Sequence, residues 1–332
     1  MIRGYVAGFG ESGIRVLDVD DGHMTVRPGA AVADSSYLAL SEDRRLLYAV
    51  LEDADAGQVA AFAVERDELR PFGNQPTGGS SPCHLSVHPS GRFVLSANYG
   101  SGSISVHPID DDGSLGERTD LVQHHGGGPV RGRQDGPHAH MVAADPSGAH
   151  VLAVDLGTDA VYRYRLDVDA GRLFADGVTS LPPGTGPRHL AFHPDGRHAF
   201  VVGELDSAVH VLDLATMDPG AAVATLPGDA NQSNHPSAIR ISDDGRFCYV
   251  ANRGHDSIAV LAVVDGPSLR LTTTVPCGGE HPRDLVLADD WLFVANQFSS
   301  RVTVFRVNAG TGTPAPHGSP VATPSPSCIV LR

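Results

Sequence analysis

Ionisable side chains recur at equivalent points of a repeated sequence pattern: His140, Arg188, Glu204, Arg253 and Arg283. Arginine guanidinium groups pair with phosphate or carboxylate oxygens, and a histidine or a glutamate can take a proton from water. The three arginines exceed the charge that one glutamate neutralises, so the set predicts a site for an anionic ligand. A salt-bridge network, to which Asp155 and Asp284 could contribute, is the structural alternative.

The repeat that carries these residues consists of a proline, an apolar strand, a D/S-G-R-type turn, a second apolar strand and a third strand. Copies begin at Pro82, Pro137, Pro187, Pro236 and Pro282, with a weaker copy near Ser36. Successive prolines are 44 to 55 residues apart, which is the length of one four-stranded propeller blade.

The two ends of the chain together supply one more copy. Residues 326–331 match only the first strand of the repeat, and residues 5–9 and 13–17 supply strands that this copy lacks. The sequence therefore predicts an all-β, seven-bladed β-propeller, closed by pairing of N- and C-terminal strands in one blade. We expect residues 1–332 to form a single domain.

The residues that follow the proline and those that end the second strand are expected at the same end of the blades. The reason is that consecutive strands run antiparallel and the first strand lies innermost. Packing positions repeat as Val, Leu or Phe, whereas these positions vary and are strongly polar, which is typical of a site for a polar ligand. The residues after the proline are Cys83, His140, Arg188, Ser237, Arg283 and Ser327, followed by His84, Met141, His189, Ala238, Asp284 and Cys328. Those ending the second strand are Leu51, Asn98, Asp155, Gly203, Asn252 and Asn296, followed by Glu52, Tyr99, Leu156, Glu204, Arg253 and Gln297.

Several polar residues have both a structural and a functional interpretation. The recurring asparagines can hold the turn that follows them or can bind substrate, and His84 can pack with His189 or bind substrate. We predict His124 and His125 at the surface and residues 123–137 as either a mobile flap or an ordinary loop. The predicted substrate-binding residues are Arg283, His84, His138, Asn98, Asn252 and Asn296.

Composition excludes several classes of function. The net charge is −15 and all 24 basic residues are arginine, without a basic patch, which argues against nucleic-acid binding and excludes a lysine Schiff base. Without an 18-residue apolar run or a signal-like N-terminus, we expect a cytoplasmic, soluble protein that does not bind membranes. The four cysteines lack metal-site spacing and are expected to be free, buried thiols. We expect no metal or cofactor.

The chain resembles the seven-bladed lactonase family that includes propeller-type 6-phosphogluconolactonases of bacteria and fungal enzymes that form a lactone from carboxymuconate. The resemblance covers essentially the whole chain and rests on GPHAH at 136–140, GPRHLAFHPDGR at 186–197 and YVANRGHDSI at 249–258. It implies that His140, Arg188, Glu204 and Arg253 are the active-site residues, and that the substrate is a small anionic sugar lactone. The chain departs from the family pattern at Ala139, beside the histidine.

The expected reaction is metal-independent hydrolysis of 6-phospho-D-glucono-1,5-lactone, in the pentose phosphate pathway. Water attacks the carbonyl with His140 or Glu204 as general base, Arg188 stabilises the oxyanion, and Arg253 with Arg283 or His84 holds the phosphate. Alternatives are a muconate-type lactonizing cycloisomerase, a metal-dependent gluconolactonase, or a non-catalytic propeller that binds an anionic metabolite or a protein. We expect a monomer or a weak homo-oligomer.

Overall fold

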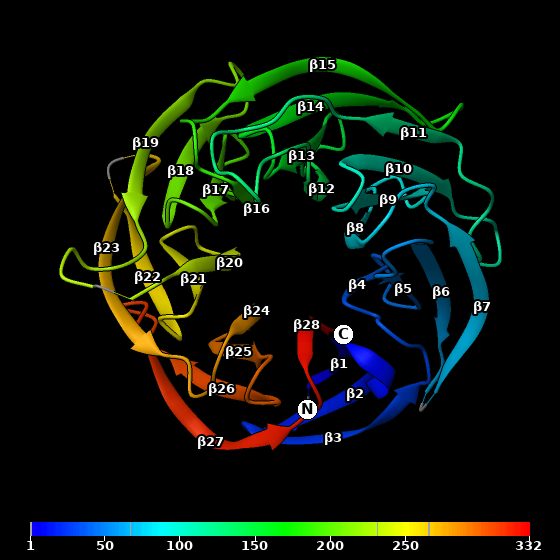
Figure 1. The fold of residues 1–332 in the computed structure, drawn as a ribbon. Helices are drawn as coiled ribbons and strands as arrows, with labels where there is room; N and C mark the ends of the chain where they lie inside the picture. Colours follow the sequence, from blue (N-terminus) through cyan, green and yellow to red (C-terminus); the bar gives the residue numbers. More distant parts are fainter. Residues whose placement is uncertain (1, 67, 231, 265) are drawn as a thin grey trace. The chain divides into compact units, whose positions relative to one another are not determined.

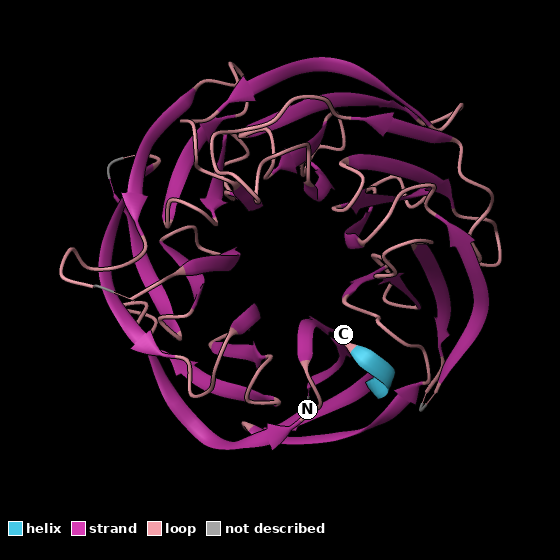
Figure 2. Ribbon diagram, viewed as in Figure 1, coloured by secondary structure: helices cyan, strands magenta, loops and turns pink. Residues whose placement is uncertain are grey.

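The computed structural model describes residues 2–66, 68–230, 232–264 and 266–332. Within these residues the regular secondary structure is strand, apart from the single 3-10 turn η1 (Gly10–Ser12), which is the helix shown in Figure 2. The strands form seven four-stranded antiparallel sheets (Figure 1). Within the described part of the chain, no helix has the length and apolar character needed to cross a bilayer.

The chain divides into two compact units. The N-terminal unit contains residues 7–15 and 28–186, with Arg332. It holds three whole sheets. The first consists of β4 (Tyr37–Leu40), β5 (Leu46–Leu51), β6 (Gln58–Val64) and β7 (Leu69–Pro76), and the second of β8 (Pro82–Val87), β9 (Phe93–Asn98), β10 (Ser103–Pro108) and β11 (Asp120–Gln123). The third consists of β12 (Ala139–Ala144), β13 (Val151–Asp155), β14 (Ala160–Asp167) and β15 (Arg172–Ser180). The first strands β4, β8 and β12 contact one another in turn.

The C-terminal unit contains residues 187–331, with 2–6 and 16–27. It also holds three whole sheets. The first consists of β16 (Pro187–Phe192), β17 (His198–Gly203), β18 (Ala208–Asp213) and β19 (Pro219–Ala224), and the second of β20 (His235–Ile241), β21 (Phe247–Arg253), β22 (Ser257–Val264) and β23 (Ser268–Pro276). The third consists of β24 (Pro282–Ala288), β25 (Trp291–Asn296), β26 (Arg301–Val307) and β27 (Pro314–Ala322). Again the first strands β16, β20 and β24 contact in turn, and β24 contacts β28 (Pro326–Leu331).

The seventh sheet combines both ends of the chain. Its order is β28, β1 (Ile2–Gly8), β2 (Ile14–Asp20) and β3 (His23–Ala30). This confirms the predicted pairing of N- and C-terminal strands in one blade. It also shows that the repeat was assigned correctly, except that β12 begins at Ala139, two residues after the proline of its copy.

Neighbouring sheets pack through the apolar residues that alternate along their strands. In the C-terminal unit, Phe200 and Val202 of β17 belong to the same buried cluster as Ile239, Cys248 and Val250 of the next sheet. All four cysteines are buried and free, as expected. Such packing of one sheet face on the next fixes the ends of the strands, where the polar columns lie.

Candidate active site

A buried ionic cluster in the C-terminal unit consists of Arg188, Glu204 and Arg253. Glu204 Oε2 lies 3.1 Å from Arg188 Nε and 2.5 Å from Arg253 Nη2. The three residues are 3%, 5% and 7% exposed, respectively. Two guanidinium groups therefore share one carboxylate out of solvent, and each buried charge depends on its partners.

Backbone carbonyls fix both guanidinium groups of this cluster. Arg188 Nη1 donates to the carbonyl oxygen of Ser237 at 2.6 Å, and Arg253 Nε donates to that of His235 at 2.8 Å. The Ser237 hydroxyl in turn donates to the carbonyl oxygen of Pro282 at 2.6 Å. The cluster is therefore tied to three successive sheets and is held in place before any ligand binds.

The residue after each proline lies at an irregularity of strand pairing. The register between the first and second strands shifts around His140, Arg188 and Arg283, and around Cys83 in the sheet β8–β11. A β-bulge inserts an unpaired residue and changes the direction of its side chain. The bulges explain why the residues after the prolines can carry varied side chains, whereas the next residues, among them His84, His189 and Asp284, are paired with the second strand.

Arg283 and Asp284 follow the same bulge in β24 but differ in their surroundings. Arg283 is half-buried, whereas Asp284 is fully buried and accepts hydrogen bonds from Arg240 Nη2 at 3.0 Å and from the backbone N–H of Ile329 at 2.9 Å. Asp284 thus joins β24 to β28 and is bonded to Arg240. It is not bonded to the pair of arginines on Glu204.

In the N-terminal unit, the bulged His140 lies among aromatic and sulfur contacts. Its Nδ1 is 3.6 Å from the Sγ of Cys83, and its ring meets that of Tyr99 edge to face, with centroids 5.5 Å apart. Tyr99 also stacks on His138 at 4.5 Å, and His138 Nδ1 lies 2.9 Å from the carbonyl oxygen of Tyr99. The structure therefore brings His138 and His140 together around Tyr99, a contact that the sequence did not reveal.

His84 occupies a packed position in β8. Its ring lies 4.3 Å from that of Tyr37, centroid to centroid, and its Nδ1 accepts a long hydrogen bond of 3.5 Å from the N–H of Val142. These contacts support the packing interpretation of His84. Binding of substrate by His84 stays a prediction.

His124 is buried, so the prediction that it lies at the surface is wrong, whereas its neighbour His125 is exposed as predicted. His124 Nδ1 pairs with Asp155 Oδ2 at 2.7 Å, and its Nε2 lies 3.0 Å from the hydroxyl of Tyr164. Its ring also stacks on Tyr162 at 4.0 Å. Aromatic burial and a buried carboxylate outweigh the exposure that the glycine-rich sequence around His124 suggests.

Asp155 organises the backbone next to the predicted histidines. Its Oδ1 accepts hydrogen bonds from the N–H groups of His138, Gly157 and Thr158 at 2.8, 2.9 and 3.1 Å. The carboxylate is fully buried. Through His124 and His138, Asp155 therefore joins the loop before β12 to the turn after β13.

Replacing Asp155 by alanine should lower the free energy of unfolding by about 2–4 kcal/mol, because several buried donors would lose their acceptor. Asp155→Asn should cost about half as much, since an amide oxygen replaces one carboxylate oxygen. Urea denaturation measures both. Asp169→Ala is the matched control: this aspartate has a 93% exposed side chain, so the change should stay within about 0.5 kcal/mol. Equal effects at the two positions would contradict the assigned role.

The three asparagines of the same column are fully buried and bond within their own sheets, and Asn252 also bonds to Thr225, which directly follows the last strand of the preceding sheet. Asn98 Nδ2 donates to Ser103, Asn252 Nδ2 to Ser257 and to the carbonyl oxygen of Thr225, and Asn296 Nδ2 to Thr303. The contacts give Asn98, Asn252 and Asn296 the structural role that their recurrence suggested. That they also touch substrate stays a prediction.

The loop 123–137 is attached to the sheet at its far end by Gln134. This side chain is 1% exposed, and its Nε2 donates to the carbonyl oxygen of Leu156 at 2.8 Å and to Asp159 Oδ1 at 2.7 Å. Gln134 and His124 are thus two buried anchors. Arg131, between them, is exposed.

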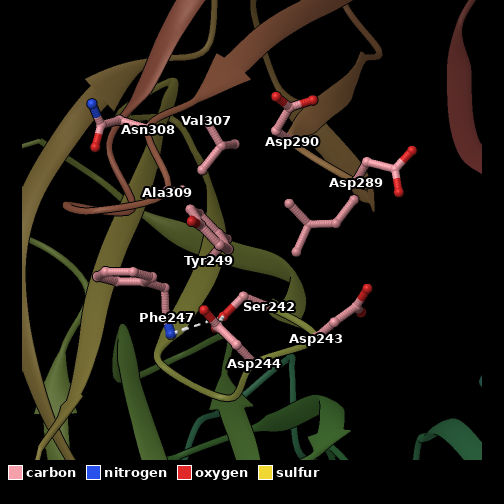
Figure 3. Close-up of a pocket in the computed structure, with 11 residues that line it drawn as sticks. Ser242, Asp243, Asp244, Phe247, Tyr249, Asp289, Asp290, Val307, Asn308 and Ala309 are labelled. Carbon is pink, nitrogen blue, oxygen red and sulfur yellow. Dashed lines mark hydrogen bonds between the residues drawn. The ribbon is translucent and has the colours of Figure 1, made fainter.

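Figure 3 shows a pocket of about 200 Å³ in the C-terminal unit, whose lining includes Phe247, the first residue of β21, whereas Arg253 is the last residue of that strand. It is built on the turns before β21 and β25, and Ser242 Oγ there accepts a hydrogen bond from the N–H of Phe247. Its lining includes Asp243, Asp244, Asp289 and Asp290. This acidic rim would repel an anionic ligand, so we place the candidate active site at the arginine cluster instead.

In the part of the chain that the structure describes, no three His, Cys, Asp or Glu side chains are grouped as metal ligands are. The expectation of a metal-free reaction stays a prediction. It depends on activity measurements in the presence of a chelator.

Comparisons with known proteins place the chain in a family. A family model described as "Lactonase, 7-bladed beta-propeller" matches residues 3–331. A 6-phosphogluconolactonase of Bacillus subtilis is 36% identical over 98% of this chain and 97% of its own length. Among the curated relatives there is also a 6-phosphogluconolactonase of Formosa agariphila, at 31% identity over 85% of this chain and 84% of its own length.

Solved structures agree with the family match. A crystal structure of a putative 6-phosphogluconolactonase from Bacteroides fragilis superposes with a TM-score of 0.93 at 29% identity, over 100% of this chain and 98% of that chain. The structure of a periplasmic gluconolactonase of Pseudomonas aeruginosa gives a TM-score of 0.93 at 28% identity, over 99% and 98% of the two chains. With the seven sheets described above, these findings confirm the prediction of an all-β, seven-bladed β-propeller. The chain belongs to the seven-bladed β-propeller lactonase family, and it is a lactonase.

Proposed function

We propose that this lactonase hydrolyses a phosphorylated sugar lactone, 6-phospho-D-glucono-1,5-lactone, to 6-phosphogluconate. The observation that carries the proposal is the buried cluster in which Arg188 and Arg253 share Glu204, with the bulged Arg283 in a neighbouring sheet. The surplus of guanidinium groups suits a phosphate, which arginine binds through paired hydrogen bonds. The names of the relatives in Bacillus subtilis and Formosa agariphila support the same substrate class.

In the proposed reaction, His140 accepts a proton from water as the water oxygen attacks the lactone carbonyl carbon. The developing oxyanion is stabilised by Arg188, which a backbone carbonyl and Glu204 hold in place. The bond between the carbonyl carbon and the ring oxygen then breaks, and the ring oxygen leaves as a hydroxyl with a proton returned by His140. The single product is an open chain with a new hydroxyl group and a carboxylic acid, which releases its proton to solvent to become a carboxylate.

Glu204 receives a different role from the one that sequence allowed. Its carboxylate accepts a hydrogen bond from Arg253 and forms an ion pair with Arg188. An oxygen held by two guanidinium groups is poorly placed to take a proton from water. We therefore assign Glu204 to orienting the two arginines and His140 to general-base catalysis.

Arg283 and Arg253 are assigned to the phosphate group. Arg283→Gln should raise KM for the phosphorylated lactone about 10–100-fold, since a charge-assisted hydrogen bond is lost, and should change KM for plain glucono-1,5-lactone much less. Steady-state kinetics on both lactones measure this. Arg270→Gln, at an exposed position of β23, is the control and should leave both values unchanged. A similar KM increase for the two lactones would count against a phosphate site.

We also propose that the protein is cytoplasmic and that it is a monomer or a weak homo-oligomer. We further propose that the seven sheets unfold as one domain of residues 1–332. A single calorimetric transition, in which the measured enthalpy equals the van't Hoff enthalpy, is expected for one domain. Two separated transitions would show that the N-terminal and C-terminal units unfold independently.

A further inference from the structure

His281 and Phe298 form a stacked pair that the sequence patterns did not single out. Their ring centroids are 3.9 Å apart and the ring planes are inclined by only 15°. His281 immediately precedes β24, and Phe298 is the second residue after β25. Both belong to the end of the C-terminal unit's sheets at which β21 ends in Arg253 and β24 begins.

The electrostatic surroundings connect His281 to the arginine cluster. Burial, followed by the positive charges of Arg253, Arg283 and Arg188, lowers the pKa of His281 to about 4, against an opposing effect of Asp256. His281 is therefore uncharged at neutral pH although it lies within the field of three guanidinium groups. An uncharged imidazole has one N–H donor and one nitrogen acceptor, whereas a guanidinium group only donates.

The backbone at His281 does not explain why a histidine stands there. Its φ is +58°, and its N–H donates to Asp256 Oδ1 at 2.8 Å. The corresponding residues before other first strands, Ser81, Gly186 and Ser325, have φ of +48°, +57° and +40°. In these three copies the position is left-handed and holds a small side chain, whereas Gly136 and His235, at the same position of two further copies, have no positive φ.

Phe298 is likewise unusual for its position. It is 66% exposed, and the equivalent positions of other copies hold Asp53, Gly100, Gly157, Leu205 and Gly254, none of which is aromatic. Its stacking partner His281 is half-buried, so one face of the phenyl ring is covered and the side chain still presents a large apolar surface to solvent. An aromatic side chain beside polar groups provides a flat apolar surface at small cost in conformational entropy.

We propose that His281 and Phe298 are further substrate-binding residues, in which the imidazole hydrogen-bonds a hydroxyl group of the lactone and the phenyl ring packs against the C–H groups of the sugar ring. This inference rests on the proposed hydrolysis of a sugar lactone. The arginines recognise the anionic group, and the pair recognises the hydroxylated ring. His281 is not the general base, because an imidazole that binds its proton so weakly is a poor acceptor at neutral pH.

Substitutions at His281 are chosen to fit its positive φ. Glycine and asparagine both adopt this conformation readily, so neither variant should be strained. With glucono-1,5-lactone, His281→Gly should raise KM about 10-fold, and His281→Asn, which keeps a donor and an acceptor, less than about threefold. With δ-valerolactone, which has no hydroxyl groups, His281→Gly should leave KM unchanged.

Two further variants complete the experiment. Phe298→Leu should raise KM for glucono-1,5-lactone several-fold without changing kcat, since it removes a stacking surface and no reacting group. Ser325→Gly makes the matching backbone change at the equivalent position of another copy, and it should leave KM unchanged. Thermal melting of every variant shows whether the fold is kept.

The outcomes separate this inference from the proposed function. If His281→Gly and Phe298→Leu both had the wild-type KM for glucono-1,5-lactone, the inference would be overturned. The proposed lactone hydrolysis would not be affected by that result. If the wild-type protein hydrolysed neither lactone, the proposed function would fail, and titration calorimetry with gluconate and 6-phosphogluconate would decide the inference. Weaker binding by His281→Gly would support it, and equal or undetectable binding by both proteins would overturn it.

Discussion

Replacing Glu204 by glutamine should destabilise the protein by about 3–5 kcal/mol, because two buried guanidinium groups would lose the carboxylate that neutralises them. Both partners are almost fully buried, with Arg188 and Arg253 side chains 3% and 8% exposed. The same substitution should lower kcat, since the arginines lose the group that orients them. Urea denaturation and steady-state kinetics measure the two effects.

The chain offers a matched control for this change. Glu65 pairs with Arg70 at 2.8 Å, but the two side chains are 51% and 56% exposed. Glu65→Gln should therefore change the stability by less than about 1 kcal/mol, as exposed ion pairs do. If Glu204→Gln were as mild as Glu65→Gln, the buried ion cluster would not have the energetic role given to it here.

His140→Gln should reduce kcat about 10²–10⁴-fold, the usual contribution of a general base, while KM and stability change little. Glutamine is close to histidine in size and keeps a polar group beside Tyr99, but it does not accept a proton at neutral pH. Hydrolysis followed by continuous titration of the released acid measures kcat. The control is His125→Gln, because His125 is exposed near the start of loop 123–137. This variant should have the kcat of the wild type.

A wild-type kcat in His140→Gln would remove His140 from the chemical step. The base would then have to be sought elsewhere, and Glu204 would return as the candidate in spite of its two arginine partners. An increase in KM without a change in kcat would instead assign His140 to substrate binding.

Much of the fold could be predicted because the sequence repeats. Most copies share the proline and the turn glycine, and the whole copies have similar apolar strands, so the same strand boundaries could be assigned to each of them. The incomplete copy at residues 326–331 indicated how β28 pairs with β1. The repeat also placed Arg188, Glu204 and Arg253 in equivalent positions. The bulges at Arg188 and Arg283 could not be predicted, since a shift in strand register leaves no mark on the order of residues.

The errors and omissions have a common physical origin in contacts between distant parts of the chain. His124 was expected at the surface because its neighbours are glycines, and only the fold brings Asp155 to its ring, 31 residues away. His281 was missed because the residue before the proline was not compared between copies. In the six copies the residue before the proline is a histidine at two positions, before β20 and β24, and a serine or glycine at the others. These residues are Ser81, Gly136, Gly186, His235, His281 and Ser325.

The most direct test of the account is the rate of 6-phosphogluconolactone hydrolysis by the purified protein, with and without EDTA and corrected for spontaneous ring opening. We predict fast turnover that EDTA does not change, because water is activated by His140 and the charges are stabilised by arginines. A rate equal to the spontaneous reaction would contradict the proposed substrate. Activity that EDTA abolished and a divalent metal ion restored would contradict the proposed mechanism.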